Sequence, residues 1–273
     1  MLRDHFHLPP GKIYLCGNSL GPQPKAAVPQ LDKELTSWRT RAVEGWWQGD
    51  GAAGGWLGFH RRLEKDLAAI VGAAPQEVTV ANALTVNLHL LMVSFFRPEG
   101  ARRKIIMEAG AFPSDQHAVI SQLKFHGLDP ETDLIEVAPR PGAYTIQTED
   151  ITKAIHETGE ELALVLWTGV HYYTGQFFDL QAIAAAGHAV GAKVGFDLAH
   201  AVGNVPLQLH EWGPDFAVWC SYKYLNGGPG APGGLFVDKR HAKDESLPRF
   251  AGWWGHRESD RFMMRREFRP EHG

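Results

Sequence analysis

A short apolar run that ends in polar residues occurs at Val194-Gly195-Phe196-Asp197-Leu198-Ala199-His200. A run of this length, bounded by turn-forming residues, is typical of a buried strand. A second such run, Phe216-Ala217-Val218-Trp219-Cys220, is followed directly by Ser221-Tyr222-Lys223-Tyr224. In an open α/β sheet, ligands bind beyond the carboxyl ends of the strands. The two runs therefore predict a buried sheet with a ligand site near Asp197 and Lys223.

Strand-like runs alternate with helix-like stretches over the rest of the chain. The predicted strands are Glu77–Ala81, Lys104–Glu108, Leu134–Val137, Ala163–Thr168, Lys193–Asp197, Phe216–Cys220 and Gly234–Val237. The predicted helices between them are Val86–Phe96, Ser114–His126, Thr148–Glu157 and Leu180–Val190. Because this alternation is the βαβ pattern, we expect an α/β protein with a mostly parallel sheet and helices on both faces, an α/β/α sandwich.

The residues before the first predicted strand have a different character. A turn at Gly17-Asn18-Ser19-Leu20-Gly21 precedes an amphipathic stretch from Ala26 to Arg41. A segment rich in Gly and Trp then runs from Gly45 to Gly58 and favours a loop over a regular element. The next helix pattern ends at Gly72, where glycine is typical of a C-cap.

Composition excludes several classes of protein. Hydrophobic residues make up 44% and charged residues 21% of the 273 residues, which excludes a disordered or collagen-like chain. A net charge of −4 argues against nucleic-acid binding, which needs a basic face. Cys16 and Cys220 form no CxxC pair, so neither a disulfide framework nor a metal site is predicted. Without a signal peptide or membrane span in the sequence, we expect a cytoplasmic protein.

Polar side chains directly after predicted strands are the first candidates for chemistry. Asp197 at a buried strand end needs a cation or hydrogen-bond donors, and His200 suits the same ligand or a backbone carbonyl. Lys223 can attack a carbonyl carbon where desolvation lowers its pKa, and Gly227 and Gly228 would let the backbone approach a ligand. The alternative interpretations are a hydrogen-bonded acid and an ordinary surface lysine.

Two predicted helix starts add further candidates. In Asn82-Ala83-Leu84-Thr85, Thr85 suits either phosphate binding or plain N-capping. In Ala111-Phe112-Pro113-Ser114-Asp115, Phe112 suits stacking on a flat ring or packing in the core, and Ser114 suits a helix cap. An amine, an acid for a pyridine nitrogen, an aromatic face and a phosphate cradle are together the parts that pyridoxal 5'-phosphate (PLP) requires. PLP is therefore the predicted cofactor.

Six separated strings of this sequence resemble kynureninase, a fold-type I PLP-dependent enzyme of the aspartate aminotransferase superfamily. They are Val194–Asn204, Trp219–Asn226, Phe112–Asp115, Asn82–Leu88, Gly17–Gly21 and Gly252–His256. The resemblance covers nearly the whole chain. It implies PLP-dependent hydrolysis of L-kynurenine, or its 3-hydroxy form, to anthranilate (or 3-hydroxyanthranilate) and L-alanine. This reaction belongs to tryptophan degradation and the kynurenine pathway towards NAD.

The resemblance also implies roles for individual residues. Lys223 would form the Schiff base and later remove the Cα proton, Asp197 would pair with the protonated pyridine nitrogen, and Tyr222 would relay a proton. The further cofactor-binding residues that it implies are Leu84, Thr85, Phe112, Pro113, Ser114, Asp115, Thr168, His200 and Trp253. Trp253 is expected to serve the neighbouring subunit of a homodimer with shared sites.

By the same resemblance we expect an N-terminal arm (1–45), a PLP-binding large domain (46–252) and the start of a C-terminal small domain (253–273) that is otherwise missing. That domain would supply an Asn for the phosphate and an Arg for the substrate carboxylate, so a catalytically inactive PLP-fold protein stays an alternative. Another is a different fold-type I enzyme such as cysteine desulfurase, although Cys16 and Cys220 do not suit its mobile catalytic cysteine. The preference between kynurenine and 3-hydroxykynurenine is left open.

Overall fold

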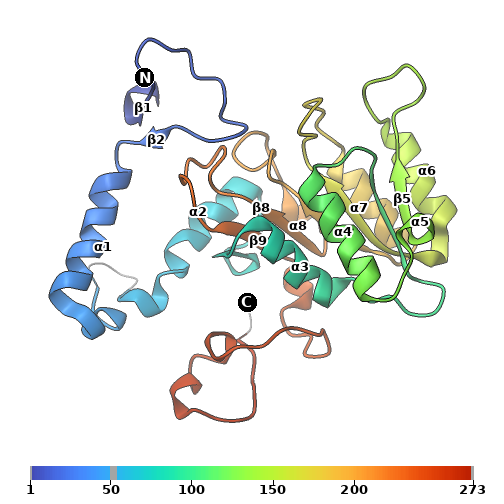
Figure 1. Cartoon of the computed structure of the whole chain (residues 1–273). Coiled ribbons are helices and arrows are strands. Elements are labelled where there is room, and N and C mark those ends of the chain that lie inside the picture. Colours follow the sequence, from blue (N-terminus) through green and yellow to red (C-terminus); the bar gives the residue numbers. More distant parts are fainter. Residues whose placement is uncertain (1, 50–53, 272–273) are drawn as a thin grey trace.

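The computed structural model describes residues 2–49 and 54–271. In this part of the chain, a seven-stranded sheet with the order β3-β9-β8-β7-β6-β4-β5 forms the centre of the molecule (Figure 1). Among these seven strands β9 is antiparallel to both neighbours, and the other pairings are parallel. The predicted mostly parallel sheet is confirmed.

The strands are β3 (Val78–Ala81), β4 (Lys104–Glu108), β5 (Leu134–Val137), β6 (Leu162–Thr168), β7 (Lys193–Asp197), β8 (Phe216–Trp219) and β9 (Gly233–Val237). A separate antiparallel pair joins β1 (Phe6–His7) to β2 (Gln23–Pro24).

Helices cover both faces of the sheet, as predicted. The helices are α1 (Ala27–Arg41), α2 (Arg61–Val71), α3 (Leu84–Phe95), α4 (Pro113–Phe125), α5 (Pro130–Asp133), α6 (Thr148–Thr158), α7 (Leu180–Ala189) and α8 (Leu209–Trp212). Two apolar clusters form the core, one with residues of α3 and α4 and the other with residues of α2, α6 and α7. Side chains alternate between the faces of a strand, so in β8 Phe216 joins the first cluster and Trp219 the second.

Helix α1 differs from the others because none of its residues is buried. It projects from the side of the molecule in Figure 1, and its apolar Leu31, Leu35 and Trp38 are exposed. By contrast α2 packs beside β3 and ends at Gly72, whose φ of 64° lies in the left-handed region. The C-cap predicted at Gly72 is therefore confirmed, and glycine suits it because it has no Cβ to clash.

The two helix starts at the predicted site differ from the expected capping. Helix α3 begins at Leu84 with Ala83 as its N-cap, and α4 begins at Pro113 with Phe112 as its N-cap. The interpretation of Thr85 and Ser114 as caps is wrong, because each lies in the second helical position. The fixed φ of proline suits the first turn of a helix, which places the start of α4 one residue before Ser114.

Two further observations concern the environment of the chain. Within residues 2–49 and 54–271, every helix is too short or too polar to cross a membrane. Both cysteines are free thiols, with Cys16 exposed and Cys220 buried.

Candidate active site

A cavity of about 90 Å³ lies where β4, β6, β7 and β8 end. It brings together ten of the predicted site residues: Leu84, Thr85, Phe112, Ser114, Asp115, Thr168, Asp197, His200, Tyr222 and Lys223. It is also lined by four residues that the sequence did not single out: Glu108, Tyr172, Ala199 and Cys220. Parallel strands that end at one edge of the sheet explain why segments so distant in the chain meet here.

Lys223 lies on the loop that joins β8 to the antiparallel strand β9. The loop closes through a hydrogen bond from the Gly227 N–H to the Ser221 carbonyl at 2.9 Å. From the N-terminal segment, Gly21 donates its N–H to the Tyr222 carbonyl at 2.8 Å. A Cβ at Gly21 would clash with the Lys223 carbonyl and with Asn226, so only glycine allows this close approach. The N-terminal turn therefore holds the backbone of the lysine loop.

The amine of Lys223 has a direct partner in the cavity. Lys223 Nζ lies 2.7 Å from His200 Nε2. Burial, together with the charges of Lys223 and His171, lowers the pKa of His200 to about 4. At neutral pH His200 is therefore an uncharged imidazole that accepts a hydrogen bond from the lysine. The sequence left open whether His200 binds a backbone carbonyl, and the structure places it on the lysine instead.

Asp197, the last residue of β7, is 6% exposed. Its Oδ1 accepts the Ala199 N–H at 2.7 Å. Burial raises the pKa of Asp197, whereas hydrogen bonds from Ala199 and Asp115 and the charge of Lys223 oppose that rise. A buried carboxylate of this kind is stabilised by a cation placed against it.

Asp115 contributes a second buried carboxyl group from the first turn of α4. Burial, then the charges of Asp197 and Glu108, raise the pKa of Asp115 well above its ordinary value. The Asp115 and Asp197 carboxyls are therefore close enough for each to influence the pKa of the other. Among the described residues, Asp115 Oδ1 is buried and has no hydrogen-bond partner.

The first turns of α3 and α4 meet at one wall of the cavity. Thr85 Oγ1 lies 2.8 Å from Ser114 Oγ, and the two helices pack against each other. The first N–H groups of a helix have no partner within the helix and carry a partial positive charge. Two such ends with two hydroxyl groups form a cradle suited to a phosphate.

Aromatic rings form the outer wall of the cavity. Phe112, 49% exposed, packs edge-on against Tyr172 with 5.2 Å between ring centroids, and Tyr172 stacks on His171 at 5.3 Å. Lys223 Nζ lies 5.9 Å from the centroid of the Phe112 ring. Phe112 therefore faces the site rather than the core. Tyr172 lies shortly after β6, and this position after a predicted strand would have indicated it as a site residue from the sequence.

The other residues missed from the sequence have different signals. Glu108 is an acid at the end of a buried strand, which is the same signal that singled out Asp197. Cys220 follows β8, and burial raises the pKa of its thiol. Ala199 acts through its backbone N–H, which leaves no signature in the sequence.

Two predicted site residues do not line this cavity. Pro113 is the first residue of α4, between Phe112 and Ser114, which do line it. Trp253 lies in the C-terminal segment, where its Nε1 donates to the Arg261 carbonyl at 3.0 Å. The expected role of Trp253 towards a neighbouring subunit stays a prediction.

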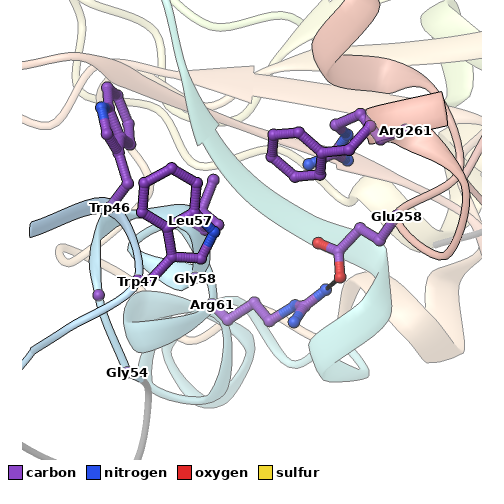
Figure 2. A pocket seen from close by; sticks show the side chains of 10 residues that line it. Trp46, Trp47, Gly54, Leu57, Gly58, Arg61, Glu258 and Arg261 are labelled. Carbon is purple, nitrogen blue, oxygen red and sulfur yellow. Dashed lines mark ion pairs between the residues drawn. The ribbon is translucent and has the colours of Figure 1, made fainter. Parts of the chain in front are cut away.

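Figure 2 shows a second cavity, of about 300 Å³, between the Trp-rich segment and the C-terminal segment. Trp46 and Trp47 lie on one side, and Arg61 forms an ion pair with Glu258. This cavity shares no residue with the one at Lys223. The predicted loop from Gly45 to Gly58 contributes to it, although residues 50–53 of that loop lie outside the described residues.

Comparisons with known proteins identify the family of the chain. The profile of the family "Aminotransferase class-V" matches residues 13–249. The chain is 53% identical to the kynureninase of Koribacter versatilis, over 99% of this chain and 64% of that protein. It is 55% identical to the kynureninase of Myxococcus xanthus, over 96% of this chain and 62% of that protein. The chain thus spans less than two thirds of the length of these relatives.

Solved structures with low sequence identity share the fold. An apo cysteine desulfurase from Thermococcus onnurineus NA1 is 18% identical with a TM-score of 0.72, covering 88% of this chain and 57% of its own. A mutant of the cystine C-S lyase C-DES, with glycine linked to its PLP cofactor, is 16% identical with a TM-score of 0.76. The match covers 99% of this chain and 66% of the C-DES chain. These likenesses show the fold alone. The family match over residues 13–249 establishes that the chain belongs to the aminotransferase class-V family.

Proposed function

We propose that this chain binds PLP through Lys223 and hydrolyses L-kynurenine or 3-hydroxy-L-kynurenine to anthranilate or 3-hydroxyanthranilate and L-alanine. The observation that carries the proposal is the meeting of Lys223, Asp197, Phe112 and a two-helix phosphate cradle in one cavity. The identity of 53% to 55% with kynureninases over nearly the whole chain supports the reaction.

The residues of the cavity fit the cofactor. Lys223 supplies the amine, and the first turns of α3 and α4 supply the phosphate cradle. The pKa of Asp197 is raised by burial, and a protonated pyridine nitrogen would provide the cation that this carboxylate needs. Asp115 Oδ1, unpartnered among the described residues, offers a further acceptor. Phe112 provides an aromatic face beside the lysine.

When bound, PLP supplies an electron sink for the electrons released at the substrate's Cα and Cβ atoms. Lys223 Nζ, once neutral, is the base that we assign to the Cα proton, and neutral His200 orients it from 2.7 Å. Asp197 would pair with the protonated pyridine nitrogen. Burial raises the pKa of Tyr222, so its phenol keeps a proton that it can donate in the later steps.

We also propose a homodimer in the cytoplasm, with Trp253 of one subunit reaching the site of the other. The exposed Leu31, Leu35 and Trp38 of α1 support an association, because a helix with an uncovered apolar side is costly in water. The free thiols of Cys16 and Cys220 are compatible with a reducing compartment.

A cysteine desulfurase is less well supported by the site. That chemistry needs an ionised thiolate on a mobile segment. Cys220 is buried directly after β8, and burial raises the pKa of its thiol. Cys16 does not line the Lys223 cavity. The catalytically inactive alternative is decided by the turnover assay below.

The test begins with purified chain and added PLP. We expect visible absorbance from lysine-bound cofactor, and borohydride reduction should attach it to the peptide that contains Lys223. Lys223→Ala should abolish the label, whereas Lys153→Ala, on the exposed side of α6, should keep it. A label elsewhere, or none, would refute the cofactor assignment.

The reaction is tested separately with the PLP-loaded chain that has not been reduced. We expect L-kynurenine to release fluorescent anthranilate, with no release from Lys223→Ala. A chain that binds PLP through Lys223 but releases no anthranilate or 3-hydroxyanthranilate would favour the inactive PLP-fold protein.

A further inference from the structure

Glu108 is a buried acid of the cavity to which no role has yet been given. It is the last residue of β4, is 3% exposed and lines the cavity together with Asp197 and Lys223. Burying a carboxyl group is unfavourable unless the group is hydrogen-bonded or neutral. A residue of this kind at the carboxyl end of a central strand therefore calls for an explanation beyond packing.

The hydrogen bonds of Glu108 connect neighbouring strand ends. Its Oε2 accepts the N–H of Thr168, the last residue of β6, at 3.4 Å. Thr168 is in register with Asp197 on β7, and the N–H of Gly169 donates to the Asp197 carbonyl at 2.8 Å. Three adjacent strands, β4, β6 and β7, are thus linked at the floor of the cavity through Glu108, Thr168 and Asp197.

The charges around Glu108 favour its neutral form. The negative charges of Asp197 on β7 and Glu136 on β5 act on Glu108, and Glu108 in turn acts on Asp115 of α4. Lys223, after β8, is the cation that lines the same cavity. Burial, reinforced by the charges of Asp197 and Glu136 and opposed by two backbone hydrogen bonds, raises the pKa of Glu108 to about 8. At neutral pH the carboxyl therefore accepts the Thr168 N–H without adding a negative charge beside Asp197.

We propose that Glu108 is a positioning residue of the cofactor pocket, which holds the ends of β6 and β7 so that Thr168 and Asp197 face the PLP ring. This inference rests on the proposed function only in taking PLP as the cofactor. It does not depend on the substrate or on turnover. Glutamine has the same length and is neutral, so it should replace the carboxyl at neutral pH, whereas alanine should not.

The experiment measures PLP affinity and the visible absorbance of bound PLP as a function of pH, on the unaltered chain and three variants. We expect Glu108→Gln to bind PLP within about twofold of the unaltered chain near pH 7. Glu108→Ala should bind about tenfold more weakly, as expected for the loss of a buried hydrogen bond. The control Glu157→Gln makes the same change of residue at an exposed position on α6, away from the cavity, and should bind as the unaltered chain does.

The pH series distinguishes positioning from plain structural support. In the unaltered chain the absorbance should change as Glu108 ionises near pH 8, and this change should be missing in Glu108→Gln but retained in Glu157→Gln. Unchanged affinity in Glu108→Ala, or a glutamine variant with the pH profile of the unaltered chain, would overturn the proposal. Should the alanine variant fail to fold, the comparison of pH profiles decides. Failure of kynurenine hydrolysis with these PLP results intact would refute the reaction and leave the role of Glu108 standing.

Discussion

Replacing Glu108 by glutamine should change how the stability of the cofactor-free chain depends on pH. The pKa of Glu108 is raised from its ordinary value near 4.5 to about 8 in the folded chain. Between these values the folded state binds a proton that the unfolded state has lost, so the free energy of unfolding falls as pH rises. The contribution is fully present below the unfolded pKa and is lost as pH rises through the folded pKa. Glutamine has no such proton.

The size of the effect follows from the two pKa values. Each pH unit between them is worth about 1.4 kcal/mol, so the glutamine variant should gain roughly 3 kcal/mol relative to the unaltered chain between about pH 5 and pH 7.5. Glu108 is almost completely buried, so solvent screens this contribution little.

Urea unfolding followed by tryptophan fluorescence measures this difference at a series of pH values. Contributions from groups that do not interact with Glu108 cancel when the variant is compared with the unaltered chain at each pH. Glu157→Gln, at an exposed position on α6, is the matched control and should show no comparable gain. Parallel pH profiles for Glu108→Gln and the unaltered chain would refute the view that Glu108 is buried with its proton.

Three other substitutions test other parts of the structure. In Gly21→Ala the new Cβ should push on the Lys223 carbonyl, so PLP should bind more weakly in an absorbance titration. The control Gly17→Ala should bind PLP normally, because its Cβ would meet only the Tyr224 ring at an ordinary contact distance. Equal affinities of the two variants would contradict the role of the N-terminal turn. Asp215→Asn should lower the free energy of unfolding, measured in urea, by about 3 kcal/mol or more, because this buried carboxylate is hydrogen-bonded to His188, His241 and Lys193. A loss below about 1 kcal/mol would argue against a stabilising role of Asp215. Asp197→Ala should weaken PLP binding and remove turnover, and normal turnover in that variant would exclude the assigned pairing with the pyridine nitrogen.

Much of the fold was predictable because it depends on local patterns. Apolar runs of strand length marked all seven strands of the sheet, and the alternation with helical stretches indicated its parallel arrangement. The reversal of β9 was not predicted, since the direction of a strand depends on which neighbour it pairs with. The domain boundaries at residues 45 and 252 and the role of Trp253 stay predictions.

The sequence by itself determined that Lys223, Asp197, Phe112 and Thr85 belong to one site, because each follows a strand or begins a helix at the same edge of a parallel sheet. It could not determine what these groups contact, since contacts between residues far apart in the chain depend on packing. The tertiary structure decided those contacts.

Three features of the site came only from that packing. They are the hydrogen bond between Lys223 and His200, the burial that raises the pKa of Asp115, and the burial that keeps Glu108 neutral. The physical reason is common to all three. A protonation state depends on how deeply a group is buried and which charges face it, and neither is fixed until strands and helices have packed together.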